Sequence, residues 1–282
     1  MSGTGPAPTE RAGEIGARVE AFVRETVAPY EHDPRRDAHG PSDVLVAELR
    51  AKAREAHEEL AAVFDAFAAD PDQWVAIITG SGLKAFCAGH DLKQQASGGG
   101  MATPPSGFAG LTSRFDMTKP VIAAVNGVAM GGGFEIVLAC DIVVAVASAS
   151  FALPEPRVGL AALAGGLQRL PRSIGLKHAM GMMLTGRRVT AEEGMRLGFV
   201  NEVVEDDVVE AAKRWAQDIL ACSPMAIRAT KEAVLRGLDE PTEVFLHRQW
   251  SMPAMTAMLA SQDAVEGPAA FAAKRSPEWG GR

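Results

Sequence analysis

The chain has 282 residues, of which 47% are hydrophobic and 22% charged, a composition typical of a soluble globular protein. Its net charge of −7 gives no support for nucleic-acid binding, which usually needs a basic surface. The chain has no apolar run of about 18 residues and no secretory leader pattern, so we expect no membrane contact and a cytoplasmic location. The dispersed cysteines Cys87, Cys140 and Cys222 predict neither a disulfide framework nor a metal site.

The first 56 residues predict helices and no strand. Residues 1–13 are rich in Gly, Pro and Thr, a composition typical of disorder. Between Glu14 and Val27 the apolar residues recur at the spacing of one helix face. Ser42 can cap a second helix that would end before Asp70-Pro71. We therefore treat residues 1–56 as a helical N-terminal segment.

The middle of the chain predicts an α/β fold. Short runs rich in Val and Ile read as buried strands, and they cover residues 74–79, 121–125 and 142–146. Because helical stretches separate them, we expect parallel pairing with both sheet faces covered. Residues 96–110 read as a loop rich in Gly, Pro and Ser. We assign 57–205 to this core and 206–282 to a C-terminal helical region.

Two glycine-containing turns offer backbone donors for a ligand. Gly131-Gly132-Gly133 lies between a strand and an apolar helix, whose first-turn N–H groups would point at a ligand. The tight turn Ala88-Gly89-His90 offers a second amide, that of His90. Two amides directed at one oxygen form an oxyanion hole. Each turn alone is more often a packing device, so both interpretations stay open at this point.

Glu135 and Glu155 are the candidate acid and base. Glu135 follows the triple glycine at the start of a helix, and Glu155 follows Pro154 at a strand end. Carboxylates are usually solvated surface groups, and each of these two has that alternative interpretation. If both face one partly apolar pocket, their pKa values are driven apart, which provides one acid and one base.

Together these stretches resemble the crotonase (enoyl-CoA hydratase/isomerase) superfamily. The resemblance rests on AFCAGHDLK (85–93), KPVIAAVNGVAMGGGFEIVLACDIVVA (119–145), FALPE (151–155) and FAAKRSPEW (271–279), in the family's order and spacing. It covers residues 57–282. Residues 18–56 instead resemble the first helices of an acyl-CoA dehydrogenase.

The resemblance implies a spiral of ββα units with a C-terminal helical region, assembled as a homotrimer or homohexamer. It also implies roles for individual residues. The backbone N–H groups of His90 and Gly132 would form the oxyanion hole, and Glu135 and Glu155 would be the acid–base pair. The substrate-binding residues would be Ala88, His90, Asp91, Leu92, Lys93, Phe271 and Lys274, the last two reaching the CoA of a neighbouring subunit. It implies an acyl-CoA thioester substrate and no cofactor.

With both glutamates present, the expected activity is an enoyl-CoA hydratase, which adds water reversibly to a 2-enoyl-CoA. Two alternatives stay open: another crotonase-type acyl-CoA dehydratase, racemase or isomerase, and a non-catalytic acyl-CoA-binding subunit. Two features depart from the family pattern. Leu163 stands where many hydratases have glycine, and the helical N-terminal segment replaces the usual first hairpin and its RP-x-x-x-NAL loop.

Overall fold

The computed structural model describes residues 36–37, 40–41, 57–90 and 103–282. Residues 57–69 are helical, which confirms the end of the second predicted helix. The helix predicted over Glu14–Val27 lies outside the described residues. The expectation of no strand before residue 57 is wrong, because β1 (Arg36–Asp37) pairs antiparallel with β2 (Gly40–Pro41). This ladder of two residues per strand is too short for a sequence pattern to reveal.

The three predicted core strands lie in one parallel sheet. Its members are β3 (Ala76–Thr79), β5 (Val121–Val125), β7 (Ile142–Val146) and β10 (Glu202–Val204). They are ordered β10-β7-β5-β3, and every neighbouring pair is parallel. The predicted parallel pairing is therefore confirmed, and both faces of this sheet are covered. In β5, Val121, Ala123 and Val125 belong to one buried cluster, whereas Ile122 and Ala124 belong to another.

A second sheet alternates with the first along the chain. It contains β4 (Ala85–Cys87), β6 (Val128–Met130), β8 (Ser150–Ala152) and β9 (Val189–Thr190). The order is β4-β6-β8-β9, and only β9 is antiparallel to its neighbour. Each strand of the first sheet from β3 to β7 is followed by one strand of the second. This alternation is the predicted spiral of ββα units, and it confirms the fold class.

The main core lies where helices cover the sheets. They are α4 (Gly132–Ala139), α5 (Gly166–Ile174), α6 (Leu176–Thr185) and α7 (Ala191–Leu197). Phe134 from α4 packs against Phe151 and Phe199, with ring centroids 5.3 and 5.1 Å away. On the other face, α8 (Val208–Leu220) buries Val208 and Ala212 against Ile122. α8 thus packs on the core, although its sequence groups it with the C-terminal region.

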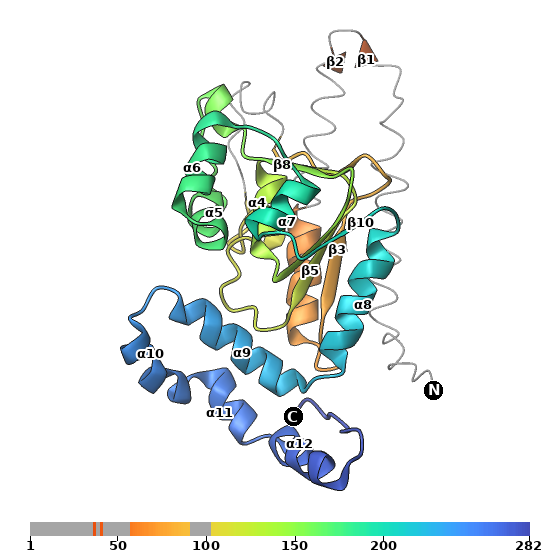
Figure 1. Cartoon of the computed structure of the whole chain (residues 1–282), viewed down its shortest axis with the longest axis vertical. Helices are drawn as coiled ribbons and strands as arrows, with labels where there is room; N and C mark the ends of the chain where they lie inside the picture. Colours follow the sequence, from red (N-terminus) through yellow and green to blue (C-terminus); the bar gives the residue numbers. More distant parts are fainter. Residues whose placement is uncertain (1–35, 38–39, 42–56, 91–102) are drawn as a thin grey trace.

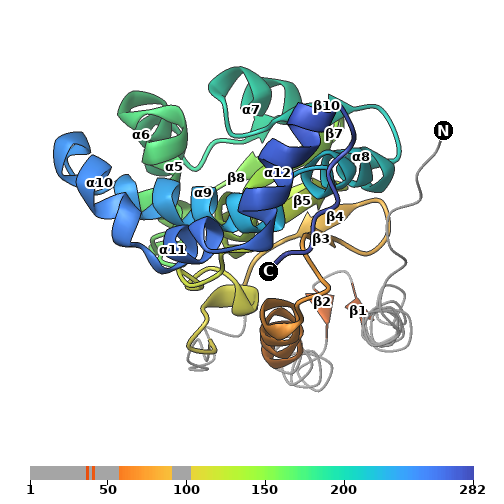
Figure 2. The same cartoon turned by 90° about the horizontal axis from the view of Figure 1, so that it is seen from below.

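The remaining helices form an arm at one end of the molecule, below the sheets in Figure 1 and spread out in Figure 2. They are α9 (Pro224–Gly237), α10 (Thr242–Arg248), α11 (Pro253–Leu259) and α12 (Gln262–Ala273). Pro224, Pro241 and Pro253 stand at the starts of three of them, as predicted. None of the helices in the described part of the chain has the length and apolar character that a membrane span requires.

Candidate active site

The three motifs meet at one edge of the second sheet. Ala88-Gly89-His90 follows β4, Gly131 follows β6, and Pro154-Glu155 follows β8. These strands are parallel neighbours, so their carboxyl ends lie side by side. In open α/β sheets this edge is the usual place for ligands. The short strands escaped prediction because three residues give no pattern, yet they bring the motifs together.

The glycines let these turns approach closely. A Cβ atom built on Gly89 would lie 3.0 Å from the amide nitrogen of Gly132 and 2.7 Å from the Met130 carbonyl oxygen. One built on Gly131, whose φ is +54°, would lie 2.9 Å from Oε1 of Glu155. Gly89 has a φ of +85°, which L side chains rarely adopt. The glycines therefore place both the His90 turn and the Glu155 side chain beside the start of α4.

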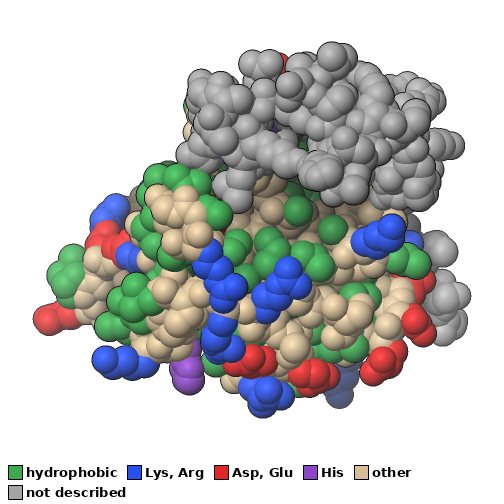
Figure 3. All heavy atoms as spheres, turned by 90° about the horizontal axis from the view of Figure 1, so that it is seen from above, with side chains coloured by type: hydrophobic (Ala, Val, Ile, Leu, Met, Phe, Trp, Pro, Cys, Tyr) green, Lys and Arg blue, Asp and Glu red, His purple; other side chains and the backbone are tan. Residues whose placement is uncertain are grey.

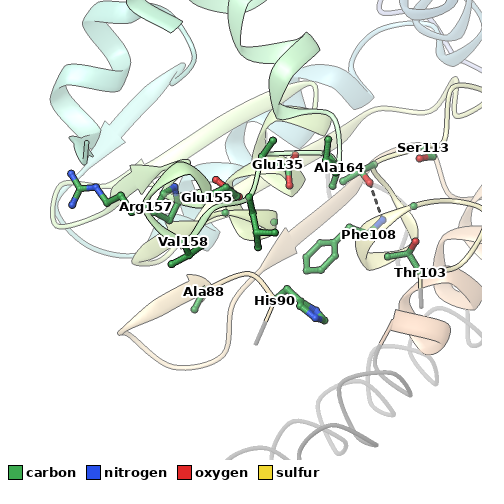
Figure 4. A pocket seen from close by; sticks show the side chains of 18 residues that line it. Ala88, His90, Thr103, Phe108, Ser113, Glu135, Glu155, Arg157, Val158 and Ala164 are labelled. Atoms are coloured by element: carbon green, nitrogen blue, oxygen red, sulfur yellow. Dashed lines mark hydrogen bonds between the residues drawn. The ribbon is translucent and has the colours of Figure 1, made fainter. Parts of the chain in front are cut away.

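A cavity of about 470 Å³ opens between the turns (Figure 4). The predicted site residues Ala88, His90, Gly132, Glu135 and Glu155 all line it. Apolar side chains supply much of the remaining wall, among them Phe108, Val158, Leu160, Leu163 and Ala164. A mostly apolar pocket with a few convergent polar groups is the usual form of a small-molecule site.

Glu135 is a buried carboxylate held in one orientation. It lies in the first turn of α4, is only 3% exposed, and its Oε1 accepts a 2.9 Å hydrogen bond from the Gly166 amide. Burial raises the pKa of Glu135, and the negative charge of Glu155 raises it further. Hydrogen bonds from the Gly166 and Ala164 amides and the charge of Arg169 act in the opposite direction. The net upward shift favours the protonated form.

Glu155 begins the short 3-10 helix η4 (Glu155–Val158). Its Oε2 atom is buried and has no hydrogen-bond partner among the described residues. Burial raises the pKa of this carboxyl as well, and its own backbone amide only partly offsets the shift. Two carboxyl groups with raised pKa values thus face one cavity. This arrangement can hold a proton on one group and leave the other ionised.

Gly132 supplies a helix-start amide at the same place. As the first residue of α4, it has no carbonyl partner within the helix for its N–H. The helix dipole adds to the attraction of that N–H for a developing negative charge. The His90 turn ends on the same cavity, so both expected oxyanion donors border it. Their joint action on one oxygen stays a prediction.

Five predicted substrate-binding positions are not among the residues described as lining this cavity. Phe271 and Lys274 lie at the end of α12, in the C-terminal arm, and Phe271 is 87% exposed. The structure therefore does not bring them to the glutamates of their own chain. Leu92 and Lys93 lie outside the described residues, as does Asp91, so the structure leaves this part of the predicted loop unassigned.

Several residues that frame the site were not singled out from the sequence. Phe108 lies in the predicted loop over residues 96–110, in a 3-10 turn η3 (Phe108–Gly110), and its ring faces Gly132. Its amide donates a 2.8 Å hydrogen bond to Oγ1 of Thr112. Nη2 of Arg169 donates a 2.8 Å hydrogen bond to the Thr112 carbonyl. The one signal for Phe108 is an aromatic residue flanked by glycines.

The surface also carries local positive charge. Figure 3 shows Lys and Arg side chains interspersed with hydrophobic ones on the face seen from above. The chain as a whole has a net charge of −7. An anionic ligand would therefore need such local cations rather than a general basic surface.

Comparison with known proteins gives consistent matches. The family model described as enoyl-CoA hydratase/isomerase matches residues 49–282. The carnitinyl-CoA dehydratase of Citrobacter koseri is 44% identical over 252 residues, which cover 86% of this chain and 97% of the relative. That of Salmonella typhi is 47% identical over 221 residues, with 77% and 85% covered.

Solved structures agree with the fold. The enoyl-CoA hydratase from Mycobacterium tuberculosis H37Rv superposes with a TM-score of 0.75 at 38% identity, covering 82% of this chain and 92% of that one. A probable enoyl-CoA hydratase/isomerase from Mycobacterium abscessus gives 0.74 at 41%, covering 81% and 89%. The family match starts eight residues before the predicted boundary at residue 57. With its two alternating sheets and its glycine turns, the chain belongs to the enoyl-CoA hydratase/isomerase family and is a crotonase-type acyl-CoA hydratase/dehydratase.

Proposed function

We propose that the protein interconverts a 2-enoyl-CoA and a 3-hydroxyacyl-CoA by reversible addition of water. The observation that carries this proposal is the pair Glu135 and Glu155, two carboxyl groups with raised pKa values that line one cavity beside the Gly132 amide. Hydration needs a base that takes a proton from water and an acid that gives a proton to C2. A cavity with both, next to a donor for the thioester oxygen, suits that need.

The proposed reaction divides into three roles. In the hydration direction, the ionised carboxylate takes a proton from water while the oxygen atom of that water bonds to C3. The protonated carboxyl group delivers a proton to C2, so the double bond becomes a single bond and the elements of water are added. The amides of His90 and Gly132 stabilise the negative charge that develops on the thioester oxygen. No cofactor is needed, because the addition of water leaves the carbon skeleton intact and involves no net oxidation or reduction.

The two glutamates differ in a way that suits different tasks. Oε1 of Glu135 is occupied by the Gly166 amide, which fixes the plane of that carboxyl group. Oε2 of Glu155 has no described partner, and its Oε1 lies over Gly131. We propose that the free oxygens of both groups hold the water between them. A buried unpartnered oxygen is costly, and a bound water or substrate would satisfy it.

The comparisons point to two different acyl groups for the substrate. The curated relatives at 44–47% identity are named carnitinyl-CoA dehydratases, whereas the solved structures at 38–41% are named enoyl-CoA hydratases. Dehydration of carnitinyl-CoA is the same chemistry in the reverse direction, with a quaternary ammonium on the acyl chain. It is therefore the second candidate, favoured by the identity of those relatives.

A substrate panel tests the proposal. The purified protein is incubated with crotonyl-CoA, a longer 2-enoyl-CoA, and carnitinyl-CoA, and the absorbance of the conjugated enoyl thioester is followed. Loss of absorbance with the first two, or its appearance with the third, supports hydration or dehydration and ranks the acyl groups. Binding of all three thioesters without turnover would instead support the non-catalytic acyl-CoA-binding alternative.

A further inference from the structure

The turn that carries Phe108 has an unusual backbone. Ala109 has φ 52° and ψ 26°, in the left-handed region that residues with a Cβ rarely adopt. Lys274 also has a φ in the left-handed range, 53°, but it ends α12 in the ordinary position of a helix C-cap. Ala109 ends no α-helix, so surrounding contacts must hold it in this conformation.

Two hydrogen bonds hold the turn. The Phe108 amide donates to Oγ1 of Thr112 at 2.8 Å, and the Ala109 amide donates to Nδ1 of His57 at 3.1 Å. The His57 ring also packs on the Phe108 ring, with centroids 4.5 Å apart at 60°. His57 is therefore the group that binds the amide of the strained residue itself. It comes from the helix over residues 57–69, 52 positions earlier in the chain.

The η3 turn shapes the cavity wall beside Gly132. The Phe108 ring lies so close to Gly132 that a Cβ atom built there would be 2.7 Å from Cε1 of Phe108. Phe108 also lines the cavity, beside His90 in Figure 4. Rotation of the η3 turn would thus move the wall next to the Gly132 amide. Small displacements at such a donor weaken transition-state stabilisation strongly.

We propose that His57 is a positioning residue: its hydrogen bond to the Ala109 amide holds the Phe108 ring against Gly132 and so keeps the thioester-oxygen subsite in shape. His57 touches neither of the glutamates in this scheme, and it acts through Phe108. The proposal rests on the proposed function for its effect on turnover, but its effect on thioester binding can be measured without any turnover.

The hydrogen bond requires a neutral imidazole, because Nδ1 must accept. Burial lowers the pKa of His57 from its ordinary 6.5, and the charge of His90 lowers it further. The η3 turn itself brings no charged side chain. At the same helix–turn contact, Arg114 and Asp65 pair with each other at 2.7 Å. His57 is thus neutral at pH 7, and protonation in acid removes the acceptor and releases the turn.

Two substitutions separate the acceptor from the ring. His57→Phe keeps an aromatic ring and removes the acceptor. His57→Asn keeps an acceptor at the same number of bonds from Cβ as Nδ1 and cannot become charged. We expect His57→Phe to lower kcat by about 10- to 100-fold with a smaller change in KM, and His57→Asn to restore most of it. His178→Asn, at an exposed histidine on α6, is the matched control.

The pH profile distinguishes positioning from simple structural support. The parent should lose kcat/KM in acid through a step below pH 6.5 that His57→Asn lacks and His178→Asn keeps. A further variant guards against a folding defect. Ala109→Gly removes the Cβ that disfavours the left-handed conformation, so adding it to His57→Phe should recover part of the lost activity. Melting temperatures of all variants show whether they fold.

A binding measurement completes the test. A 2-enoyl-CoA conjugated to an aromatic ring absorbs at longer wavelength when its thioester oxygen accepts strong hydrogen bonds. The parent and His57→Asn should shift this absorbance, and His57→Phe should shift it less. A shift without turnover in the parent would reject the proposed function and leave the inference standing. Equal shifts and equal pH profiles in parent and His57→Phe would overturn the inference, and no shift in the parent would overturn both.

Discussion

The amide of Gly166 and the carboxyl group of Glu135 are fitted to each other. The amide donates a 2.9 Å hydrogen bond to Oε1, and a Cβ atom built on Gly166 would lie 3.1 Å from that same oxygen. Gly166 begins α5, and Glu135 lies in the first turn of α4. Two helix starts thus fix one oxygen of a buried carboxyl group and leave the second for a ligand.

This geometry predicts the effect of removing either acid. Glu135→Gln keeps an oxygen for the Gly166 amide and loses the titratable group. Glu155→Gln likewise removes the titratable group on the other wall of the cavity. Each should reduce turnover by about 10²–10⁴-fold, the usual contribution of general acid–base catalysis. Thioester affinity should change little, because the cavity keeps its shape. Steady-state kinetics and equilibrium binding check both, and turnover like the parent's by either variant would disprove that residue's role.

Stability should respond to pH through Glu135. Its pKa in the folded state is raised above the ordinary 4.5, so its contribution to stability is full below pH 4.5 and is lost as pH rises through the folded pKa. Glutamine has no such loss. We therefore expect Glu135→Gln to raise the melting temperature at neutral pH and to match the parent in acid. Scanning calorimetry across pH 4 to 8 measures this, and a constant difference over that range would contradict it.

Much of this site could be predicted from the sequence because its residues lie in short contiguous motifs. Glu135, Glu155, Gly132 and His90 each belong to a stretch whose turn chemistry is local. The residues that frame them are set by tertiary contacts instead. His57 and Ala109 meet across 52 positions, and no periodicity reports such a contact.

The strands that the sequence predicts are the longer ones. The five-residue strands β5 and β7 were predicted at their observed bounds, because a buried parallel strand is a continuous apolar run. The strands β4, β6 and β8 have three residues each and lie within or next to the three turn motifs, whose turn signals hide them. They are nevertheless what aligns the motifs at one edge.

The space around Gly132 makes it a sensitive position. Gly132→Ala keeps the amide N–H but places a methyl group 2.7 Å from Cε1 of Phe108 and next to the cavity. We expect a large loss of turnover with a folded protein, as Phe108 must move. Gly181→Ala is the matched control, since nothing lies within 4 Å of its Cβ position inside α6. It should be active and more stable by about 0.5–1 kcal/mol. Equal activity of the two variants would show that the Gly132 amide lies outside the reacting region.

The C-terminal arm predicts a homo-oligomer, and the resemblance to the crotonase superfamily implies a trimer or hexamer. Large apolar side chains stand exposed on it, including Trp250 at 61%, Val265 at 73% and Phe271 at 87%. A gathering of exposed apolar residues is typical of an interface. Light scattering during gel filtration measures the mass, and a monomer across a wide concentration range would contradict the prediction.

Within such an oligomer, Phe271 and Lys274 should serve a neighbouring subunit's CoA, since they lie at the end of α12 and do not line the cavity that holds the glutamates of their own chain. Lys274→Glu should then raise KM for a CoA thioester through repulsion of its phosphates, with little change in kcat. A truncated thioester that lacks the nucleotide separates this effect from a general one, because its kinetics should be the same in parent and variant. Lys177→Glu, at an exposed lysine of α6, controls for the change in net charge. If Lys274→Glu changes the KM for both substrates equally, or for neither, the tail has no role in binding the nucleotide.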